Sequence, residues 1–466
     1  MLPKNIKKVH FIGIGGYGMS ALALILLKKG YTVSGSDLKE SPLTKTLIER
    51  GAEVTIGHRA ENLGSARFIV YSTAVPADNP ELEAARQNGL TIWHRSELLA
   101  DLINNSYGIA IAGAHGKTTI TAMTALLLEA GGLDPTAVIG GVLPAYGSNA
   151  RLGRSKYLVA EADESDSSFT RYYPRLALVT GIDADHLEHY ENDYTHLHSA
   201  YRTFLSNLTG DGTAVLCADD PNLRSLAAEL DIRVTYYALA DIPAAQPDYY
   251  AANITINGRN STFDLYHRGE LLASGITLTV PGAHNISNAV GALALAHILG
   301  LDPAVCAPAL AAFTGVGRRF EIIGTASGVT VVDDYAHHPT EIRATLEAAR
   351  PGSSRVICVF QPHRYSRTAY FLDEFTRAFD DADLLLLHSV YPAGEAPIPG
   401  ATSEALAERI RLQGKVVVHY SGDITILEEK AAALSRPGDL IITMGAGDIT
   451  KSAPRILKKL QAAGKK

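Results

Sequence analysis

Cysteines and long apolar runs are both scarce in this chain of 466 residues. The three cysteines, Cys217, Cys306 and Cys358, lie far apart and form no CxxC pair, which excludes a disulfide scaffold and a cysteine-ligated zinc site. The apolar run at residues 21–27 is much shorter than the roughly 20 residues that span a bilayer. The first residues show no signal-peptide pattern. We therefore expect a protein of the reducing cytoplasm.

An excess of basic residues is also missing. Lys and Arg number 42 against 49 Asp and Glu, which gives a formal net charge of −7. A general binder of nucleic acids or membrane surfaces would present a basic face, so we expect neither nucleic-acid binding nor membrane insertion. Hydrophobic residues make up 46% of the chain and charged residues 20%, which excludes disorder as the main state.

Short β-branched runs alternate with helical patterns along nearly the whole chain, which is typical of parallel sheets with crossover helices. Strands are predicted at residues 9–14, 32–36, 67–72, 107–112, 157–161, 176–182, 329–332, 355–360, 382–388, 415–419 and 439–443. Asn257-Gly258 lies inside an alternating stretch and indicates an antiparallel hairpin. We therefore predict an α/β protein whose central sheet is mixed.

Two low-propensity stretches suit linkers between domains, Asn104-Asn105-Ser106 and Gly315-Val316-Gly317. They predict three domains, at residues 1–105, 106–316 and 317–466. The first and third are expected to be Rossmann-like, and the second to carry a nucleotide on a P-loop ATPase-type sheet. The basic C-terminal segment, residues 451–466, is interpreted as a helix with lysines near its C-terminal end.

A glycine loop follows the predicted strand at 107–112 and opens a helix. It consists of Gly113, Ala114, His115, Gly116, Lys117, Thr118 and Thr119. Backbone N–H groups at a helix N-terminus favour anions, Lys117 can reach β- and γ-phosphates, and the Thr118 hydroxyl can bind Mg²⁺. Only two residues separate the glycines, where the usual phosphate loop has four. The loop predicts ATP binding; the alternative is a glycine turn with a chance lysine.

Four carboxylates, Glu161, Asp163, Glu164 and Asp166, crowd together directly after a predicted strand. Such crowding is costly unless cations neutralise it, so a divalent metal is a natural inference, and a solvated acidic turn is the alternative. The predicted strand at 176–182 runs into a second polar segment, Asp183-Ala-Asp185-His186. Both segments are expected at the same edge of the sheet.

A second glycine pattern, Gly13-Ile-Gly15-Gly16-Tyr17-Gly18, satisfies GxGxxG between a strand and a helix. Asp37 ends the next predicted strand, where NAD enzymes place a ribose-binding acid. Read locally, this is a dehydrogenase fingerprint. The pattern shows only that a pyrophosphate could bind, and both NAD and UDP carry one. The ATP-type loop in the next domain, and the lack of an evident hydride-transfer dyad, count against NAD.

The short phosphate loop resembles that of the Mur ligase superfamily, the ATP-dependent amide ligases of bacterial cell-wall synthesis. This resemblance implies that Thr118, Glu161 and His186 hold Mg²⁺. It further implies that His284, Asn285 and Asn288 contact the adenine and Arg319 the γ-phosphate; helix capping by Asn285 and surface ion pairing by the arginine are the alternatives. One departure is that residues 187–209 lack the lysine that several Mur ligases carry there, which leaves a second metal site in doubt.

Further stretches resemble the members that add L-alanine to UDP-N-acetylmuramate: residues 10–20, 71–75 with Asn79-Pro80-Glu81, 147–153, 333–341, 361–368 and 390–395. The resemblance implies UDP-sugar binding by Gly15, Gly16, Tyr17, Gly18, Met19, Ser36, Asp37, Ser72, Thr73 and Asn149. It also implies an amino-acid site of Tyr335, His337, His363, Arg364 and Arg367.

The reaction that these residues permit is an ATP-driven amide synthesis through an acyl phosphate, giving ADP and phosphate. Lys117, Glu161, His186, Arg319, His337 and Arg367 are its expected catalytic residues, and domain closure is expected to bring the substrates together. Three alternatives stay open: a peptide-recycling ligase that joins a tripeptide to the same sugar nucleotide, an NAD(P)-dependent oxidoreductase, and a non-catalytic nucleotide-gated binding protein.

Overall fold

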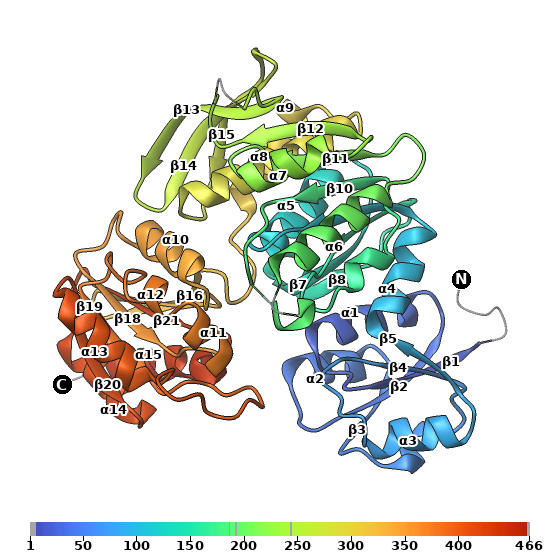
Figure 1. Cartoon of the computed structure of the whole chain (residues 1–466), viewed down its shortest axis with the longest axis horizontal. Helices are drawn as coiled ribbons and strands as arrows, with labels where there is room; N and C mark the ends of the chain where they lie inside the picture. The colour runs from blue at the N-terminus through green and yellow to red at the C-terminus, as the bar shows by residue number, and fades with distance from the viewer. Residues whose placement is uncertain (1–5, 186, 192, 243–244, 464–466) are drawn as a thin grey trace. The chain divides into compact units, whose positions relative to one another are not determined.

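The structure, a computed structural model, describes residues 6–185, 187–191, 193–242 and 245–463. Its strands form three sheets, of five, ten and six strands (Figure 1), which confirms the predicted α/β fold class. The chain separates into two compact units. Met1–Ala252, Asp264–Ile276 and Ser287–Ala311 form the first, and Asn253–Phe263, Thr277–Ile286 and Ala312–Lys466 form the second.

The N-terminal sheet is wholly parallel, in the order β3-β2-β1-β4-β5. Its strands are β1 (Lys8–Ile12), β2 (Thr32–Asp37), β3 (Glu53–Ile56), β4 (Phe68–Tyr71) and β5 (Thr91–His94). Its helices are α1 (Tyr17–Lys28), α2 (Pro42–Glu49), η1 (Ala60–Leu63), α3 (Pro80–Gln87) and α4 (Arg95–Asn104). The strand order reverses at β1, so the loop after β1 lies at the switch point where such sheets bind ligands. The Rossmann-like prediction is confirmed.

Helix α1 is buried along two turns, residues 19–26 without interruption. A helix that covers only one face of a sheet would expose every third or fourth residue. This helix packs on its own sheet and also contacts β7 (Thr136–Leu143) and β8 (Ser148–Arg151) of the next sheet. The first two sheets therefore share a core within the first unit.

The ten-stranded sheet has the order β15-β14-β13-β12-β11-β10-β6-β9-β7-β8. Its other strands are β6 (Tyr107–Ala112), β9 (Tyr157–Glu161), β10 (Leu176–Val179), β11 (Thr213–Cys217), β12 (Arg233–Ala238), β13 (Tyr249–Asn257), β14 (Asn260–His267) and β15 (Glu270–Leu278). Its helices are α5 (Lys117–Ala130), η2 (Pro144–Tyr146), η3 (Ser168–Arg171), η4 (Leu187–Tyr190), α6 (Tyr194–Ser206), α7 (Pro221–Ala228), α8 (Ala283–Ile298), α9 (Pro303–Cys306) and η5 (Ala307–Ala312).

This sheet is mixed, as predicted. Its central strands pair in parallel, whereas β7 and β8 are antiparallel. Adjacent strands joined by two residues must run antiparallel, and β13 is joined in this way to β14, and β14 to β15. The first turn is Gly258-Arg259, one residue later than the predicted Asn257-Gly258, because Gly258 takes the left-handed first position (φ +60°) while Asn257 stays in the strand.

The third sheet has the order β16-β17-β21-β18-β19-β20, and only β16 runs antiparallel to its neighbour. Its strands are β16 (Glu321–Ala326), β17 (Val329–Asp334), β18 (Val356–Phe360), β19 (Leu384–His388), β20 (Val417–Ser421) and β21 (Leu440–Met444). Its helices are α10 (Pro339–Ala349), α11 (Tyr365–Tyr370), α12 (Leu372–Phe375), α13 (Ser403–Gln413), α14 (Ile424–Leu434), η6 (Asp448–Lys451) and α15 (Ser452–Ala463).

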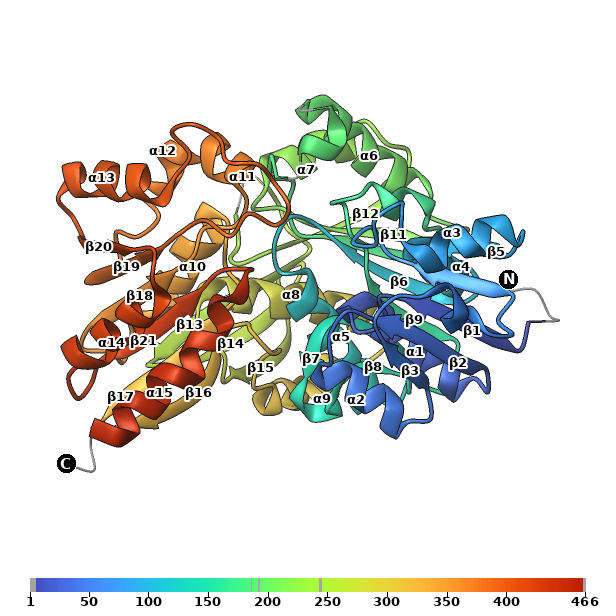
Figure 2. The same cartoon turned by 90° about the horizontal axis from the view of Figure 1, so that it is seen from below.

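Helices cover both faces of the third sheet. Figure 2 shows α12 and α13 on one side and α14 and α15 on the other. Alternate residues of β18 serve the two cores: Cys358 and Phe360 pack toward α12 and α13, and Ile357 and Val359 toward α14 and α15. Burial on both faces explains the unbroken apolar strands.

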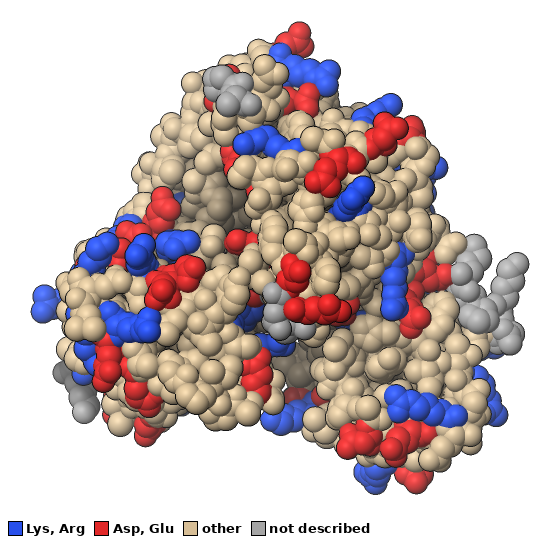
Figure 3. All heavy atoms as spheres, in the orientation of Figure 1, with Lys and Arg blue, Asp and Glu red and all other residues tan. Residues whose placement is uncertain are grey.

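No helix among the described residues is long and apolar enough to cross a membrane. On the face drawn in Figure 3, acidic and basic side chains are interspersed, and neither sign gathers into one large patch. This distribution fits the small net charge of −7.

Candidate active site

The phosphate loop between β6 and α5 is held from the side by the segment that follows β10. The Thr180 hydroxyl donates to the His115 carbonyl (2.6 Å), and the Ala114 N–H donates to the Gly181 carbonyl (3.0 Å). Gly113 has φ +119°, and a Cβ there would lie 2.1 Å from Thr180 Oγ1. Because Thr180 and Gly181 serve the loop, β10 ends at Val179 and not at residue 182 as predicted.

Lys117, the first residue of α5, is folded back onto its own loop. Its ammonium donates to the Gly113 carbonyl (2.6 Å) and to both carboxylate oxygens of Glu164 (2.7 and 2.9 Å). Burial by itself would lower the pKa of Lys117, but attraction from Glu164 and Asp163 outweighs it and raises the pKa. Lys117 is therefore a charged group already placed at the loop.

Each of the four crowded carboxylates has a partner within the protein, and Asp163 and Asp166 share one. Glu161 accepts from the Gly140 N–H, Glu164 pairs with Lys117, and Arg95 lies 3.1 Å from Asp163 and 3.5 Å from Asp166. Burial raises the pKa of Asp163, but Lys117 and Arg95 lower it to about 2. Protein cations thus neutralise much of this charge, so crowding alone does not require a metal.

A magnesium ion still fits the donor atoms at this edge. Thr118 is buried at the start of α5, and Glu161 ends β9 close enough to Lys117 to contribute to its raised pKa. Hydroxyl and carboxylate oxygens are the ligands that Mg²⁺ prefers. The third predicted ligand, His186, lies outside the described residues.

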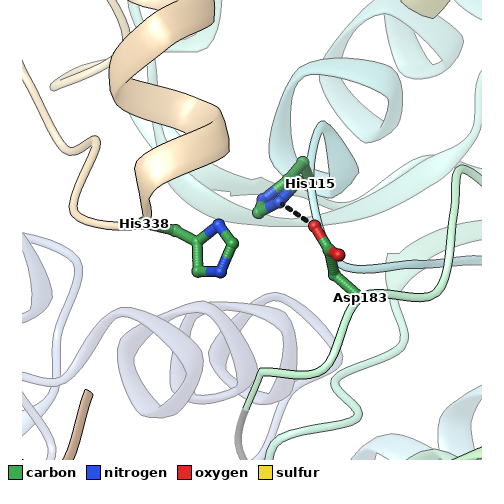
Figure 4. A group of neighbouring side chains, drawn as sticks. All are labelled: His115, Asp183 and His338. Carbon is green, nitrogen blue, oxygen red and sulfur yellow. Dashed lines mark hydrogen bonds and ion pairs between the residues drawn. The ribbon is translucent and has the colours of Figure 1, made fainter. Parts of the chain in front are cut away.

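His115 lies beside Asp183, which follows β10 (Figure 4). Its Nε2 is 3.1 Å from Asp183 Oδ2. The structure pairs this ring with a carboxylate from the segment that also fastens the loop backbone.

Helix α8 brings one predicted nucleotide residue to the loop. A Cβ at Gly116 (φ +80°) would lie 2.6 Å from Asn288 Oδ1, so Asn288 packs directly against the loop. The Asn285 amide instead donates to the Pro281 carbonyl (2.6 Å), a local bond at the start of the helix, and His284 is exposed.

The N-terminal glycine loop is closed by the residues at the end of β2. The Gly15 N–H donates to Asp37 Oδ2 (2.8 Å), and the N–H groups of Gly13 and Ile14 donate to the Ser36 carbonyl. A Cβ at Gly13 would lie 3.8 Å from the Ser72 hydroxyl, at the end of β4. The carboxyl ends of β1, β2 and β4 therefore bring these predicted UDP-site residues together.

Among the remaining predicted UDP residues, Gly16, Tyr17, Gly18 and Met19 lie at the start of α1, Asn149 lies beside it, and Thr73 follows β4. Tyr17 is exposed and Met19 buried, while the Thr73 hydroxyl is 3.1 Å from His94 Nε2. Asn149 is buried and donates to the Tyr17 carbonyl (2.5 Å) and the Ser20 hydroxyl (3.0 Å). This placement gives Asn149 a role in supporting α1; direct contact with UDP stays a prediction.

The arginine pair and Tyr335 of the third domain form one group. The guanidinium carbons of Arg318 and Arg319 lie 4.8 and 5.1 Å from the Tyr335 ring centroid. Arg318 is tied down by Asp333 (3.2 Å) and by the Gly445 carbonyl (2.6 Å). Arg319 is 34% exposed and lies 3.7 Å from Glu341, so it is the more available of the two.

The predicted amino-acid residues follow β17 and β18. The His337 and His363 rings are 5.9 Å apart, and Arg367 Nη1 lies 3.5 Å from His363 Nδ1. His337 Nδ1 is 2.9 Å from the Tyr335 carbonyl. Arg364 has φ +70° and precedes α11. The third sheet thus places two imidazoles and a buried guanidinium beside one another.

Known proteins match the chain over nearly its full length. The family models described as "Mur ligase family, catalytic domain", "Mur ligase middle domain" and "Mur ligase, glutamate ligase domain" match residues 8–107, 111–296 and 318–447. A UDP-N-acetylmuramate–L-alanine ligase of Sorangium cellulosum is 46% identical, over 99% of this chain and 98% of the relative. The chain belongs to the Mur ligase family. A second such ligase, from Symbiobacterium thermophilum, is 48% identical over 98% of this Mur ligase and 95% of the relative.

Solved structures agree with this placement. The crystal structure of UDP-N-acetylmuramate-alanine ligase from Thermotoga maritima has a TM-score of 0.83 and 29% identity, over 98% of this Mur ligase and 99% of that chain. A murein peptide ligase from Psychrobacter arcticus has a TM-score of 0.72 at 24% identity, over 98% and 99%, and shares the fold.

Sequence reasoning gave no role to Glu81, although it lies beneath the predicted UDP site of this Mur ligase. Its buried carboxylate accepts from His10 Nε2 (3.0 Å), Ser36 Oγ (2.6 Å) and Asn62 Nδ2 (2.5 Å). Burial raises its pKa, but these hydrogen bonds lower it to about 2. Arg95 was also missed. For Glu81 the available signal was the stretch Asn79-Pro80-Glu81 that carries the family resemblance, and for Arg95 it was the position directly after β5.

Proposed function

We propose that this Mur ligase joins L-alanine to the lactyl carboxylate of UDP-N-acetylmuramate and converts ATP to ADP and phosphate, in the synthesis of peptidoglycan precursors. The observation that carries the proposal is full-length identity of 46–48% to UDP-N-acetylmuramate–L-alanine ligases. We place the reaction in the cytoplasm, on the strength of the cysteine pattern in the sequence.

ATP supplies the activation that a carboxylate needs before it can react with an amine. The lactyl carboxylate attacks the γ-phosphorus in line, ADP leaves, and an acyl phosphate forms. The alanine amine then attacks the acyl carbon, and the tetrahedral adduct expels phosphate. Charge neutralisation and positioning do most of the catalytic work.

In the first unit, the N–H groups of the phosphate loop and the Lys117 ammonium bind the ATP phosphates. Lys117 exchanges Glu164 for phosphate oxygens when the nucleotide enters. Thr118 and Glu161, together with His186, would hold Mg²⁺, which neutralises phosphate charge when bound. Asn288, with His284, Asn285 and Thr119, contacts the nucleotide, and Arg319 contacts the γ-phosphate.

The UDP-sugar is assigned to the N-terminal sheet. Its diphosphate lies at the N-terminus of α1, where backbone N–H groups favour anions. Hydroxyls of Ser36, Ser72 and Thr73 lie at the same edge as Asp37. The contributing positions of the glycine loop are Gly15, Gly16, Tyr17, Gly18 and Met19.

Alanine is assigned to the third domain. The Arg367 guanidinium donates two parallel N–H hydrogen bonds to the carboxylate of alanine. The His337 Nδ1–H donates to the Tyr335 carbonyl, which sets the tautomer of the neutral ring so that the proton is on Nδ1 and not on Nε2. His337 Nε2 therefore takes the proton that the attacking amine loses. Tyr335, His363 and Arg364 complete the site.

Phosphate release from ATP tests the proposal. Purified protein is given ATP, Mg²⁺ and UDP-N-acetylmuramate, with L-alanine, glycine, L-serine or L-Ala-γ-D-Glu-meso-diaminopimelate added separately. Release that requires both the sugar nucleotide and L-alanine supports the alanine-adding ligase. Release only with the tripeptide assigns the peptide-recycling reaction instead, and no release with any amine substrate overturns both.

A further inference from the structure

The loop after β19 is fastened to the segment after β18. These strands are parallel neighbours, and backbone pairing resumes beyond their ends. The Arg364 N–H donates to the Tyr391 carbonyl (2.8 Å), and the Tyr391 N–H donates to the Pro362 carbonyl (2.8 Å). The His363 and Tyr391 rings stack with centroids 5.5 Å apart and planes 8° apart. The loop therefore lies directly beside the side chains assigned to alanine.

Tyr391 is fixed from its other side as well. A Cβ at Gly447 would lie 2.8 Å from Tyr391 Cγ and 2.6 Å from Gln361 Oε1. The tyrosine thus packs against the bare backbone at Gly447, between that backbone and His363. Tyr391 is therefore packed on two sides at the beginning of the loop.

The loop then turns back on itself. The Glu395 N–H donates to the Pro392 carbonyl (2.9 Å), and the two residues between them have left-handed φ values, +49° at Ala393 and +90° at Gly394. An alanine rarely adopts this conformation, so contacts around the turn must maintain it. The turn brings the half-buried Glu395 carboxylate to the start of α11.

That carboxylate binds Ser366 at two points. Glu395 Oε2 accepts from the Ser366 N–H (3.0 Å), and Oε1 accepts from the Ser366 hydroxyl (2.7 Å). The first N–H groups of a helix have no acceptor within the helix. The N-cap residue of α11, Arg364, makes no side-chain capping bond. A residue 29 positions away therefore supplies the acceptor for one N–H group of the first turn.

We propose that Glu395 is a positioning residue for the amino-acid substrate. By fixing Ser366 it holds the first turn of α11, and with it the Arg367 guanidinium one residue later and the His363 ring one residue before the helix cap. Glu395 touches neither substrate nor nucleotide; it acts through these two residues. The inference rests on the proposed function for its choice of substrate.

The experiment compares Glu395→Ala and Glu395→Gln with Glu408→Ala, a control that removes an exposed carboxylate from α13. The KM for L-alanine should rise about tenfold in Glu395→Ala, which corresponds to the loss of a hydrogen bond to a charged group. The KM values for ATP and UDP-N-acetylmuramate should stay within about twofold, since the phosphate loop and the N-terminal sheet contribute no residue to the Glu395–Ser366 pair. Glu395→Gln should lie between wild type and the alanine variant, because its amide oxygen can still accept one bond.

A double variant tests the pairing itself. Ser366→Ala should raise the KM for L-alanine by less than Glu395→Ala, because it removes the hydroxyl bond and keeps the bond from the Ser366 N–H. Adding Ser366→Ala to Glu395→Ala should change the KM little further, because the hydroxyl bond is already lost in Glu395→Ala. Additive effects would overturn the proposal. So would an alanine KM in Glu395→Ala that matches the control, or equal increases for all three substrates together with a lower melting temperature.

Hydrogen exchange separates failure of this proposal from failure of the proposed function. Amides of residues 364–370 should exchange faster in Glu395→Ala than in Glu408→Ala, whatever the substrate is. If wild type shows no alanine-dependent phosphate release, the proposed function fails. Unchanged exchange in this segment would overturn the positioning role by itself.

Discussion

Glu164→Gln tests whether the Glu164 carboxylate holds the Lys117 ammonium in place at the phosphate loop. Glu164 is 4% exposed and meets the Lys117 ammonium at 2.7 and 2.9 Å. Two opposite charges at this distance attract by about 6 kcal/mol at an effective dielectric constant near 20, before desolvation is subtracted. Removing one partner of a buried pair typically destabilises a protein by about 3–5 kcal/mol. Asp163 still attracts Lys117, so we expect the lower end, about 3 kcal/mol.

The same substitution should strengthen nucleotide binding. If Lys117 binds the ATP phosphates as proposed, they must displace the Glu164 carboxylate from it in the wild type, whereas a neutral glutamine competes weakly. We expect the Kd of a non-hydrolysable ATP analogue to fall about tenfold, the equivalent of about 1.4 kcal/mol. Lower stability together with tighter nucleotide binding would show that Glu164 neutralises Lys117 in the nucleotide-free protein and is displaced when the nucleotide binds.

Urea denaturation measures the first effect and isothermal titration calorimetry the second, both near neutral pH. Glu83→Gln, which neutralises an exposed carboxylate on α3, is the matched control. If Glu164→Gln weakens nucleotide binding, or leaves the free energy of unfolding at the control value, the reasoning about Lys117 is refuted.

Gly113→Ala should abolish phosphate release, because the new Cβ would meet Thr180 Oγ1 at 2.1 Å; activity at the wild-type level would contradict the loop geometry. Burial raises the pKa of Asp334 to about 6 from 3.8, so stabilisation is complete below about pH 4 and about 3 kcal/mol of it is lost as the pH rises through about 6. Asp334→Asn should flatten urea-denaturation stability over that window. The lowered pKa of Glu81, about 2, has the opposite sign: its stabilisation is present above about pH 4.5 and lost on acidification toward pH 2, a loss that Glu81→Gln should remove. Arg367→Lys should raise the KM for L-alanine about 10- to 100-fold, since lysine cannot offer two parallel donors, with the KM for ATP unchanged.

The parts of the fold that follow from local pattern were predictable. The strands Tyr107–Ala112 and Tyr157–Glu161 lie where the apolar runs indicated, and the glycine loops fall at strand ends as their spacing required. The end of a strand was less predictable where its last residues bind a neighbouring segment instead of continuing the sheet. The run at 176–182 is apolar enough for a longer strand, but Thr180 leaves the sheet to bind the phosphate loop.

Partners of buried charges could not be predicted, because they depend on contacts distant in sequence. Lys117 and Glu164 are separated by 47 residues, Arg95 and Asp163 by 68, and His10 and Glu81 by 71. The sequence showed that negative charge was crowded near Glu161, and a divalent metal ion was the cation inferred to neutralise it. The structure shows that an arginine from the preceding domain supplies part of the compensation.

The continuous burial of α1 limits where the chain can be cut to make a soluble fragment. A fragment that stops near residue 105 would lack β7 and β8 and would expose an apolar helix surface of the kind that drives association. Asn149, left in the other fragment, would lose the Tyr17 and Ser20 groups that its amide binds. Chimeras that exchange sugar-nucleotide modules between related ligases should therefore carry the β7–β8 hairpin along with the glycine loop.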